Sequence, residues 1–375
     1  MPLFLLTDAV RAAGVLLAAL TFLSACGDTG TLAVDLRSAR SEDALLAPPR
    51  PAGVDTLRVM TWNLRFASTR EGYEDWPTRR PDLAALLALS QVDVLGVQEL
   101  VPERDGHQQL EDVQAMLPGF AYIGRSRSAD PNDEHSGVYY RSARLEALRE
   151  GYFWLSPAPT TPGSFGYGNQ GNPRMATWVE FRDRRSKARF TLVNTHFDHR
   201  SREARYRAAD QIAGYRSGDP AYANDGVELD PQLPMVLIGD FNVARSVRED
   251  WAPPGYSGPT VDPLKTTRMP ALYAPLPTAL TQYDPGLVPM AGNLSPYTRL
   301  VLDGPFVDAL EVAERAYPLP IGTFNGFAEL REGIIDWVLV SPELRVLQSY
   351  IETYRPQGQY PSDHLPVVAD IALPG

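Results

Sequence analysis

The chain has 375 residues and a net charge of -11, from 35 Lys and Arg against 46 Asp and Glu, and it contains one cysteine. Its length and 44% hydrophobic content suit one large α/β or two-sheet domain and exclude a disordered or fibrous chain. A single cysteine also excludes an intrachain disulfide framework and a cysteine-cluster zinc site, so any metal must be bound by oxygen or imidazole ligands.

The N-terminal segment has the pattern of an export signal. Residues 12–25 form an apolar run that is too short to cross a bilayer comfortably, and Cys26 follows directly. The sequence LSAC at 23–26 resembles the bacterial lipobox, in which the signal is removed and the new N-terminal cysteine is acylated. We therefore predict a signal peptide over 1–25 and a secreted chain that is anchored to the membrane of the cell envelope by lipid on Cys26. The alternative is an ordinary signal peptide, which would release the chain to the periplasm or the exterior.

The rest of the chain divides into a tether and one domain. Residues 26–55 are polar and then rich in proline, without an apolar period, and predict a tether. Over 56–375, short strand-like runs alternate with helical stretches and turns, which indicates one mixed α/β domain. The expected strands are 56–63, 92–97, 120–124, 136–141, 176–181, 189–195, 234–239, 334–340 and 365–372, and the expected helices are 78–90, 107–117, 201–216 and 307–315.

Two segments of the domain have no clear place in this alternation. Residues 250–300 combine many prolines with tyrosine and glycine, and we interpret them as an insertion over the core. Their aromatic residues motivate the hypothesis that the insertion lies near a substrate cleft. The arginine-rich run at 182–189 is, in the simplest interpretation, a solvated hairpin tip. Alternatively, it forms a local phosphate-binding rim together with the arginines between 200 and 207.

Several apolar runs end in polar residues that are capable of catalysis. These residues are Asn63, Glu99, His196, Asp240 and Asn242. Near the C-terminus, Asp336 lies inside a strand-like run, and Asp363 and His364 come immediately before the final expected strand. Strand ends often carry catalytic groups because a rigid sheet aims them into a shared crevice. Taken singly, each has a structural explanation, such as a turn cap for an asparagine or a satisfied core imidazole for His196. Asp336 lies between two apolar residues, so we expect it to be partly buried and to need a partner such as His364.

The order and the flanking residues of these segments resemble the endonuclease/exonuclease/phosphatase superfamily, which has the deoxyribonuclease I-like fold. The matching motifs are WN at 62–63, QE at 98–99, NTH at 194–196, GDFN at 239–242, ID at 335–336 and SDH at 362–364, so the resemblance spans about residues 56–372. The stretches 151–164 and 172–179 further resemble a bacterial branch of the superfamily with poorly defined substrates. The resemblance implies an α/β fold, a four-layer α/β/β/α sandwich of two mixed β-sheets flanked by helices.

The resemblance also implies a reaction, the attack of water on phosphorus with a divalent metal, usually Mg²⁺, for which Mn²⁺ can substitute. It implies that Glu99 binds the metal directly and that Asn63 and Asp363 complete or steady the metal shell. Either His364 or Asp240 would accept the proton of the attacking water, while Asp336 orients His364. The remaining matches imply phosphate contacts from Asn242, His196, Tyr140 and Arg174.

The biological substrate is the least constrained part of this interpretation. A phosphate ester of a nucleotide, a nucleic acid or a lipid head group would fit, because substrate choice in such folds depends on loops around a common site. The acidic balance argues against binding long nucleic acid through a general basic field but permits a local groove, so a nuclease acting on extracellular DNA or RNA is the alternative. The alternative of another class is a catalytically silent surface binding lipoprotein, against which the complete set of metal and base residues argues. We expect a monomer.

Overall fold

The computed structural model describes residues 48–70, 72–168, 171–245 and 295–374. The predicted signal peptide, Cys26 and residues 26–47 of the predicted tether lie outside these ranges, as do residues 250–294 of the predicted insertion. None of the helices within the described ranges combines the length and the apolar character that a bilayer-spanning segment needs.

The first of two sheets contains both ends of the domain. Its six strands are β1 (Leu57–Asn63), β2 (Val94–Leu100), β3 (Phe120–Ile123), β4 (His135–Arg141), β11 (Arg345–Ile351) and β12 (Val367–Ala372). They lie in the order β11, β12, β1, β2, β4, β3. Only β1 and β2 are parallel neighbours, and all other pairs are antiparallel.

The second sheet repeats this arrangement with other strands. It contains β5 (Leu145–Trp154), β6 (Met175–Asp183), β7 (Arg189–His196), β8 (Met235–Asp240), β9 (Val307–Asp308) and β10 (Asp336–Val340). Their order is β5, β6, β7, β8, β10, β9, and the parallel pair is β7 and β8. A parallel pair needs a crossover, which is α1 in the first sheet and α3 in the second. The fold is thus mixed α/β, as predicted.

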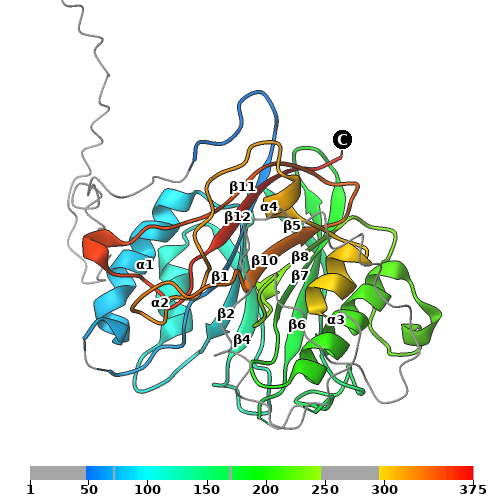
Figure 1. Cartoon of the computed structure of the whole chain (residues 1–375), viewed down its shortest axis with the longest axis horizontal. Coiled ribbons are helices and arrows are strands. Elements are labelled where there is room, and N and C mark those ends of the chain that lie inside the picture. The colour runs from blue at the N-terminus through cyan, green and yellow to red at the C-terminus, as the bar shows by residue number, and fades with distance from the viewer. Residues whose placement is uncertain (1–47, 71, 169–170, 246–294, 375) are drawn as a thin grey trace, which may run out of the picture. The chain divides into compact units, whose positions relative to one another are not determined.

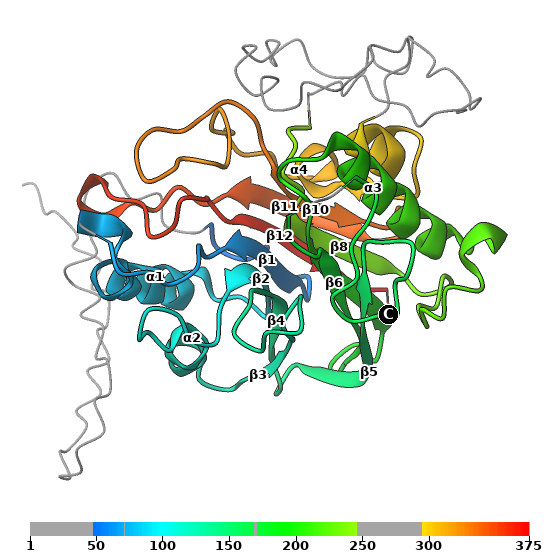
Figure 2. The ribbon, with the colours of Figure 1, turned by 90° about the horizontal axis from the view of Figure 1, so that it is seen from below.

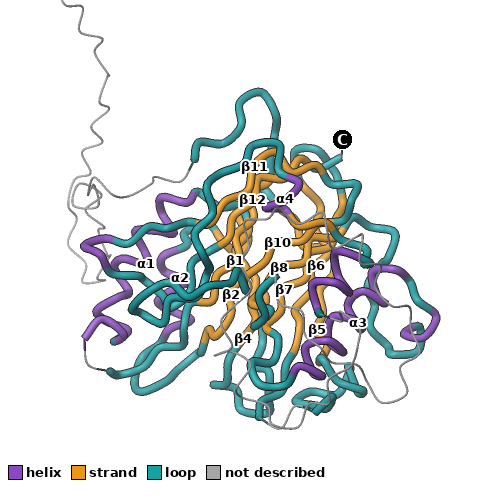
Figure 3. Tube along the Cα trace, viewed as in Figure 1, coloured by secondary structure: helices purple, strands orange, loops and turns teal. Residues whose placement is uncertain are grey.

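The helices lie on the outer sides of the two sheets, as Figure 1 and Figure 3 show. Helices α1 (Trp76–Ser90) and α2 (Gln109–Met116) cover the first sheet, and α3 (Arg202–Ser217) covers the second. The remaining helical segments are short: α4 (Ala309–Val312), a π-helical turn at Thr298–Leu302, and 3₁₀ turns at Gly72–Glu74, Pro220–Tyr222 and Pro356–Gly358. Helix α3 begins at the cap Ser201, whose Oγ accepts a hydrogen bond from the N–H of Ala204, and ends at Gly218 in the left-handed conformation.

The two sheets pack face to face, and the view of Figure 2 shows them between the helices. An added Cβ at Gly96 on β2 would lie 2.4 Å from Cδ1 of Ile238 on β8, so the sheets approach each other too closely here for any residue but glycine. Beside this contact, Nε2 of Gln98 donates to Oδ1 of Asn194 on β7 at 2.7 Å, and both side chains are buried. A buried polar pair of this kind fixes the position of one sheet on the other, because sliding would leave its groups unpaired.

Most of the predicted elements are confirmed to within a few residues, but one predicted helix is wrong and two strands were not predicted. The predicted helix at 307–315 is a two-residue strand, β9, followed by one helical turn, α4. Strands β5 and β11 were not predicted. The first half of β5 reads LEALRE, which favours a helix, and the strand forms because it pairs along its length with β6 at the edge of the sheet.

Candidate active site

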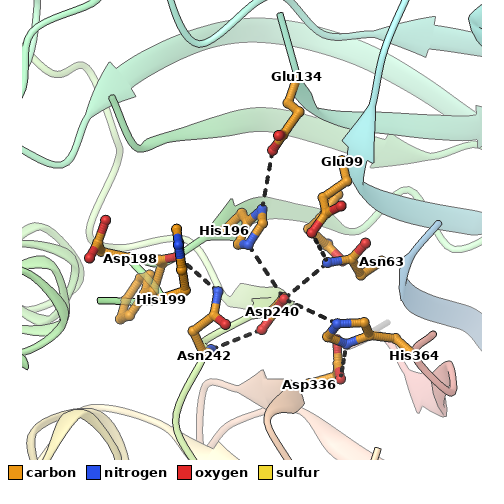
Figure 4. Close-up of polar contacts among 12 residues, drawn as sticks. Asn63, Glu99, Glu134, His196, Asp198, His199, Asp240, Asn242, Asp336 and His364 are labelled. Atoms are coloured by element: carbon orange, nitrogen blue, oxygen red, sulfur yellow. Dashed lines mark hydrogen bonds and ion pairs between the residues drawn. The ribbon is translucent and has the colours of Figure 1, made fainter. Parts of the chain in front are cut away.

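The topology brings the ends of seven strands to one edge of the sandwich. Strands β1, β2, β7 and β8 end there, while β4, β10 and β12 begin there because each runs antiparallel to one of these four. The predicted catalytic residues occupy these ends, so their side chains meet although they are far apart in the sequence (Figure 4). Within the sheets, Asp240 pairs directly with His196 on one side and with Asp336 on the other.

His364 and Asp336 form a buried pair at this edge. Nδ1 of His364 lies 2.9 Å from Oδ2 and 3.2 Å from Oδ1 of Asp336. Nε2 of the same ring faces Oδ2 of Asp240 at 3.8 Å. Burial would lower the pKa of His364, but the charges of Asp336 and Asp240 outweigh burial and raise this pKa well above its usual range. His364 is therefore a cation at neutral pH, with the Nδ1 proton directed at Asp336.

Asp240 stands at the centre of the cluster and connects it to both sheets. Its Oδ2 accepts a hydrogen bond from Nδ2 of Asn63 at 3.0 Å and lies 3.4 Å from Nε2 of His196. Its Oδ1 accepts the backbone N–H of Asn242 at 2.8 Å. Burial raises the pKa of Asp240 to about 7, against the opposing effect of the charge on His364. A carboxylate with a pKa near neutrality is suited to accept a proton during a reaction.

A local distortion of β2 aims Glu99 at the same point. The register between β2 and β4 shifts between Val97 and Leu100, and Glu99 has a φ of 55°, in the left-handed region that is strained for a residue other than glycine. Its Oε1 accepts a hydrogen bond from Nδ2 of Asn63 at 3.1 Å, and its Oε2 faces Nη1 of Arg65 at 3.3 Å. Strain of this kind at a side chain that joins a polar cluster is typical of a functional position.

Glu99, Asp363 and Asn63 supply oxygen atoms that suit a hard divalent cation. Oδ2 of Asp363 lies 3.8 Å from Nε of Arg65, so the carboxylates of Glu99 and Asp363 share one guanidinium. Oδ1 of Asn63 accepts the backbone N–H of Arg65 at 2.9 Å and retains a second lone pair. Carboxylate and amide oxygens are the ligands that Mg²⁺ prefers, so these residues fit the predicted metal.

Asp240, Asp336 and His364 form a different group, and their potential ligand atoms all lie within 4.8 Å of one another. His364 already contacts both oxygens of Asp336. We therefore interpret this trio as the group that handles protons, and the oxygens of Glu99 and Asp363 as the metal side of the site.

His196 lies beside Asp240, and two cations, Arg127 and Arg174, lie near its ring. Nδ1 of His196 lies 4.0 Å from Oε2 of Glu134, whose carboxylate accepts hydrogen bonds from Arg127 at 2.6 and 2.9 Å. Burial, together with the charges of Arg174 and Arg127, holds the pKa of His196 well below its usual range, so this ring is neutral at neutral pH. Burial also raises the pKa of Glu134 to about 7.

Arg174 lies where it can meet an anion beside His196. Its side chain is 5% exposed, and its Nη2 lies 2.8 Å from Nδ1 of His199. Its Nε lies 3.7 Å from Oδ2 of Asp198, which is too far for a hydrogen bond, and neither Nε nor Nη1 has a hydrogen-bond partner in the part of the chain that the structure describes. A buried guanidinium with unused N–H groups suits the oxygens of a phosphate.

Sequence reasoning missed four polar partners of the predicted residues, namely Arg65, Arg127, Glu134 and His199. Glu134 comes directly before β4, and β4 begins at the active edge because it is antiparallel to β2. A polar residue just before a strand, the same signal that points to Asp363 and His364, could therefore have indicated Glu134. His199 follows the NTH motif by three residues in the sequence and could have been found from that spacing.

The prediction that Tyr140 contacts phosphate is wrong. Tyr140 pairs with Val94 at the start of β2, whereas Glu99 lies near the end of that strand. Its ring packs on Phe181 with 4.9 Å between ring centroids. The side chain therefore belongs to the core at the end of the sandwich away from the cluster.

The arginine-rich run at 182–189 also lies away from the cluster, because it connects β6 to β7 at the end opposite His196. Nη2 of Arg182 contacts the carboxylate of Glu146 at 2.7 Å. The interpretation as a hairpin tip is confirmed, and the alternative of a phosphate-binding rim at the site is wrong for this run. Of the arginines between 200 and 207, Arg205 is buried and donates to the backbone oxygen of Asp198 at 2.9 Å.

Comparison with known proteins agrees with this geometry. Among solved structures, an endonuclease/exonuclease/phosphatase from Bacteroides vulgatus is 25% identical, with a TM-score of 0.63 over 85% of this chain and 100% of that one. The mannosyl-6-phosphatase of Bacteroides thetaiotaomicron is 26% identical, with a TM-score of 0.60 over 84% of this chain and 99% of that one. ANGEL2, a 2′,3′-cyclic phosphatase, shares the fold at 15% identity, with a TM-score of 0.54 over 86% of this chain and 97% of that one. No curated protein matches the chain.

The model of the Endonuclease/Exonuclease/phosphatase family matches residues 60–364, a span that begins inside β1 and ends at His364. This span is well over half of the chain and includes every residue of the cluster described above. The chain therefore belongs to the endonuclease/exonuclease/phosphatase family and is a hydrolase of phosphate esters.

Proposed function

We propose that the chain hydrolyses a small phosphate ester with the help of a divalent cation, Mg²⁺ or Mn²⁺, that Glu99, Asp363 and Asn63 hold. One observation carries this proposal. The carboxylate of Asp240 lies between two histidines: His364, which is cationic and paired with Asp336, and His196, which is neutral. The cation would polarise a phosphoryl oxygen and neutralise charge on the leaving oxygen.

Asp240 is the group that takes the proton of the attacking water in this proposal. Its pKa of about 7 makes it a stronger base than an ordinary aspartate, and its Oδ1 is held by the backbone N–H of Asn242. His364 already carries its proton, so it acts through its charge and its Nε2–H, which can donate to a phosphoryl oxygen. Asp336 keeps this ring cationic and oriented.

His196 and Arg174 would bind the oxygens of the phosphoryl group. A neutral His196 can donate one hydrogen bond, and Arg174 offers unused N–H groups on a buried guanidinium. The amide of Asn242 is fixed by its donation to the backbone oxygen of Phe197 at 3.0 Å, which leaves its oxygen to orient water. These groups together would hold the phosphorus in line with the base.

A small phosphomonoester is the substrate class that we favour over nucleic acid. The likeness to a mannosyl-6-phosphatase supports it, as does the net charge of -11, which opposes the approach of a long polyanion. Secretion and a lipid anchor on Cys26 belong to the proposal as well and rest on the LSAC sequence at 23–26. Incorporation of labelled palmitate that is lost in Cys26→Ser tests the anchor.

The enzymatic proposal is tested by the hydrolysis of a panel of esters with Mg²⁺, Mn²⁺ or EDTA. The panel contains p-nitrophenyl phosphate, bis-p-nitrophenyl phosphate, mannose 6-phosphate, a nucleoside monophosphate, DNA and a phospholipid. We expect metal-dependent release of phosphate from monoesters, abolished by EDTA and by Glu99→Ala but not by Glu111→Ala, an exposed glutamate on α2. Preferential cleavage of DNA or lipid would reject the substrate class, and no turnover of any ester would favour a silent binding protein.

A further inference from the structure

Arg65 occupies the space between the two carboxylates on the metal side of the site. Its Nη1 lies 3.3 Å from Oε2 of Glu99, and its Nε lies 3.8 Å from Oδ2 of Asp363. The guanidinium is 25% exposed, while the two acids are 14% and 10% exposed. Arg65 is the basic residue that contacts both of these acids directly in the part of the chain that the structure describes.

The surrounding loop fixes the backbone of Arg65 but leaves its side chain less constrained. The backbone N–H donates to Oδ1 of Asn63, and the backbone oxygen accepts hydrogen bonds from Arg79 at 2.6 Å and from Gln109 at 2.9 Å. The φ angle of Arg65 is 54°, a left-handed conformation that these three bonds stabilise. The guanidinium itself rests on the Phe66 ring, 4.0 Å from its centroid, and its contacts with the carboxylates are long for hydrogen bonds.

We propose that Arg65 is a built-in counter-cation: it neutralises Glu99 and Asp363 when no divalent ion is bound and competes with the ion for them. This inference rests on the proposed function, because it needs the ion to bind at these two acids. Mg²⁺ takes oxygen ligands at about 2.0–2.1 Å, much closer than the guanidinium lies to the two carboxylates. The ion and the guanidinium are like charges that share the same two partners, so each weakens the binding of the other.

Two measurable consequences follow from this competition. Removing the charge of Arg65 should tighten metal binding, because the ion no longer has to displace a cation. The same change should destabilise the metal-free chain, because two largely buried carboxylates lose their counter-ion. Saturation with the ion should remove much of this second effect, since linkage makes the two influences reciprocal.

The test measures Mn²⁺ binding by electron paramagnetic resonance and isothermal titration, and the thermal midpoint in EDTA and in saturating Mn²⁺. The variants are Arg65→Gln, which removes the charge, and Arg65→Lys, which keeps it. The control is Arg104→Gln, because Arg104 lies 3.9 Å from the centroid of the same Phe66 ring but is exposed and makes no ion pair with Glu99 or Asp363 among the contacts of the described residues.

We expect Arg65→Gln to lower the dissociation constant for Mn²⁺ about tenfold, with Arg65→Lys and Arg104→Gln within about threefold of wild type. In EDTA, Arg65→Gln should melt below Arg104→Gln, and Mn²⁺ should close most of that gap. Unchanged or weaker Mn²⁺ binding by a folded Arg65→Gln overturns the inference and leaves the proposed function intact. Failure of the wild-type chain to bind Mn²⁺ would instead overturn both the inference about Arg65 and the proposed function. The binding of Mn²⁺ by the wild-type chain therefore distinguishes the two outcomes.

Discussion

Nδ1 of His364 lies 2.9 Å from Oδ2 of Asp336, and both side chains are buried. The pair joins the two sheets, because Asp336 begins β10 while His364 lies three residues before the start of β12. Asp336 belongs to the ladder with β8, so its position is set by the backbone of a central strand. The carboxylate that orients the imidazole is thus held by a strand, although His364 itself lies in the segment before β12.

The first prediction concerns the charge that Asp336 maintains on His364. Asp336→Asn removes a carboxylate that raises the pKa of His364, so this pKa should fall and the ring should lose its proton at a lower pH. We expect kcat/KM to fall about 10²-fold or more, and its alkaline limb to move to lower pH. The pH profile of kcat/KM between about pH 5 and pH 10 is the measurement.

Asp225→Asn is the matched control. Asp225 accepts a hydrogen bond from the hydroxyl of Tyr215 at 2.8 Å, and Tyr215 lies in the last turn of α3, at the end away from the site. It should leave the profile unchanged. An alkaline limb that does not move in Asp336→Asn would show that His364 does not depend on Asp336 for its proton.

The second prediction concerns Arg174 and the phosphate. Arg174→Gln removes a buried cation with unused N–H groups, so we expect kcat/KM to fall about 10²-fold, mainly through a higher KM. Arg174→Lys keeps the positive charge but lacks the planar set of guanidinium N–H donors, so it should recover part of the loss in kcat/KM. Steady-state kinetics on the best monoester measure this, with Arg185→Gln as control, because Arg185 is exposed in the hairpin between β6 and β7, away from the cluster. A lower kcat at unchanged KM in Arg174→Gln would mean that the residue acts only in the transition state.

The residues around Asp240 show which features of the site could be predicted from the sequence and which could not. The strand ends that carry His196 and Asp240 were predicted correctly, because an apolar run followed by a polar motif fixes both the strand and the position of the motif. Contacts such as Glu134 with His196 were not predicted, since they join elements that only the packing of two sheets brings together. The same holds for Tyr140, whose place in the motif order does not reveal that it lies at the other end of β4.

The third prediction concerns the close approach of the two sheets at Gly96. An added Cβ would meet Cδ1 of Ile238 at 2.4 Å, so Gly96→Ala should lower the free energy of unfolding by about 1–3 kcal/mol. Ile238→Val removes that Cδ1 and should cost less in the Gly96→Ala background than in the wild type. Urea unfolding of the four proteins in this cycle measures the coupling. Additive effects would show that the sheets do not touch at this point.

The fourth prediction distinguishes the roles of two carboxylates, Asp240 and Glu134. Burial raises the pKa of each to about 7, so either could give the pH dependence of the rate. If Asp240 accepts the proton of water, it must be ionised, so kcat should rise with pH through about 7 to a plateau, before the alkaline limb that His364 sets. Asp240→Asn should lower kcat by about 10³-fold or more and abolish this dependence.

Glu134→Gln should keep the rising limb, because Glu134 lies 4.0 Å from Nδ1 of His196 and acts on that ring rather than on water. Its effect should be a smaller loss of kcat, since the neutral amide still fills the space beside Arg127 and His196. The opposite result, a flat profile in Glu134→Gln and a retained limb in Asp240→Asn, would assign the titration to Glu134. The proton acceptor would then lie on the phosphate side of the site, and His364 would be left to act through its charge alone.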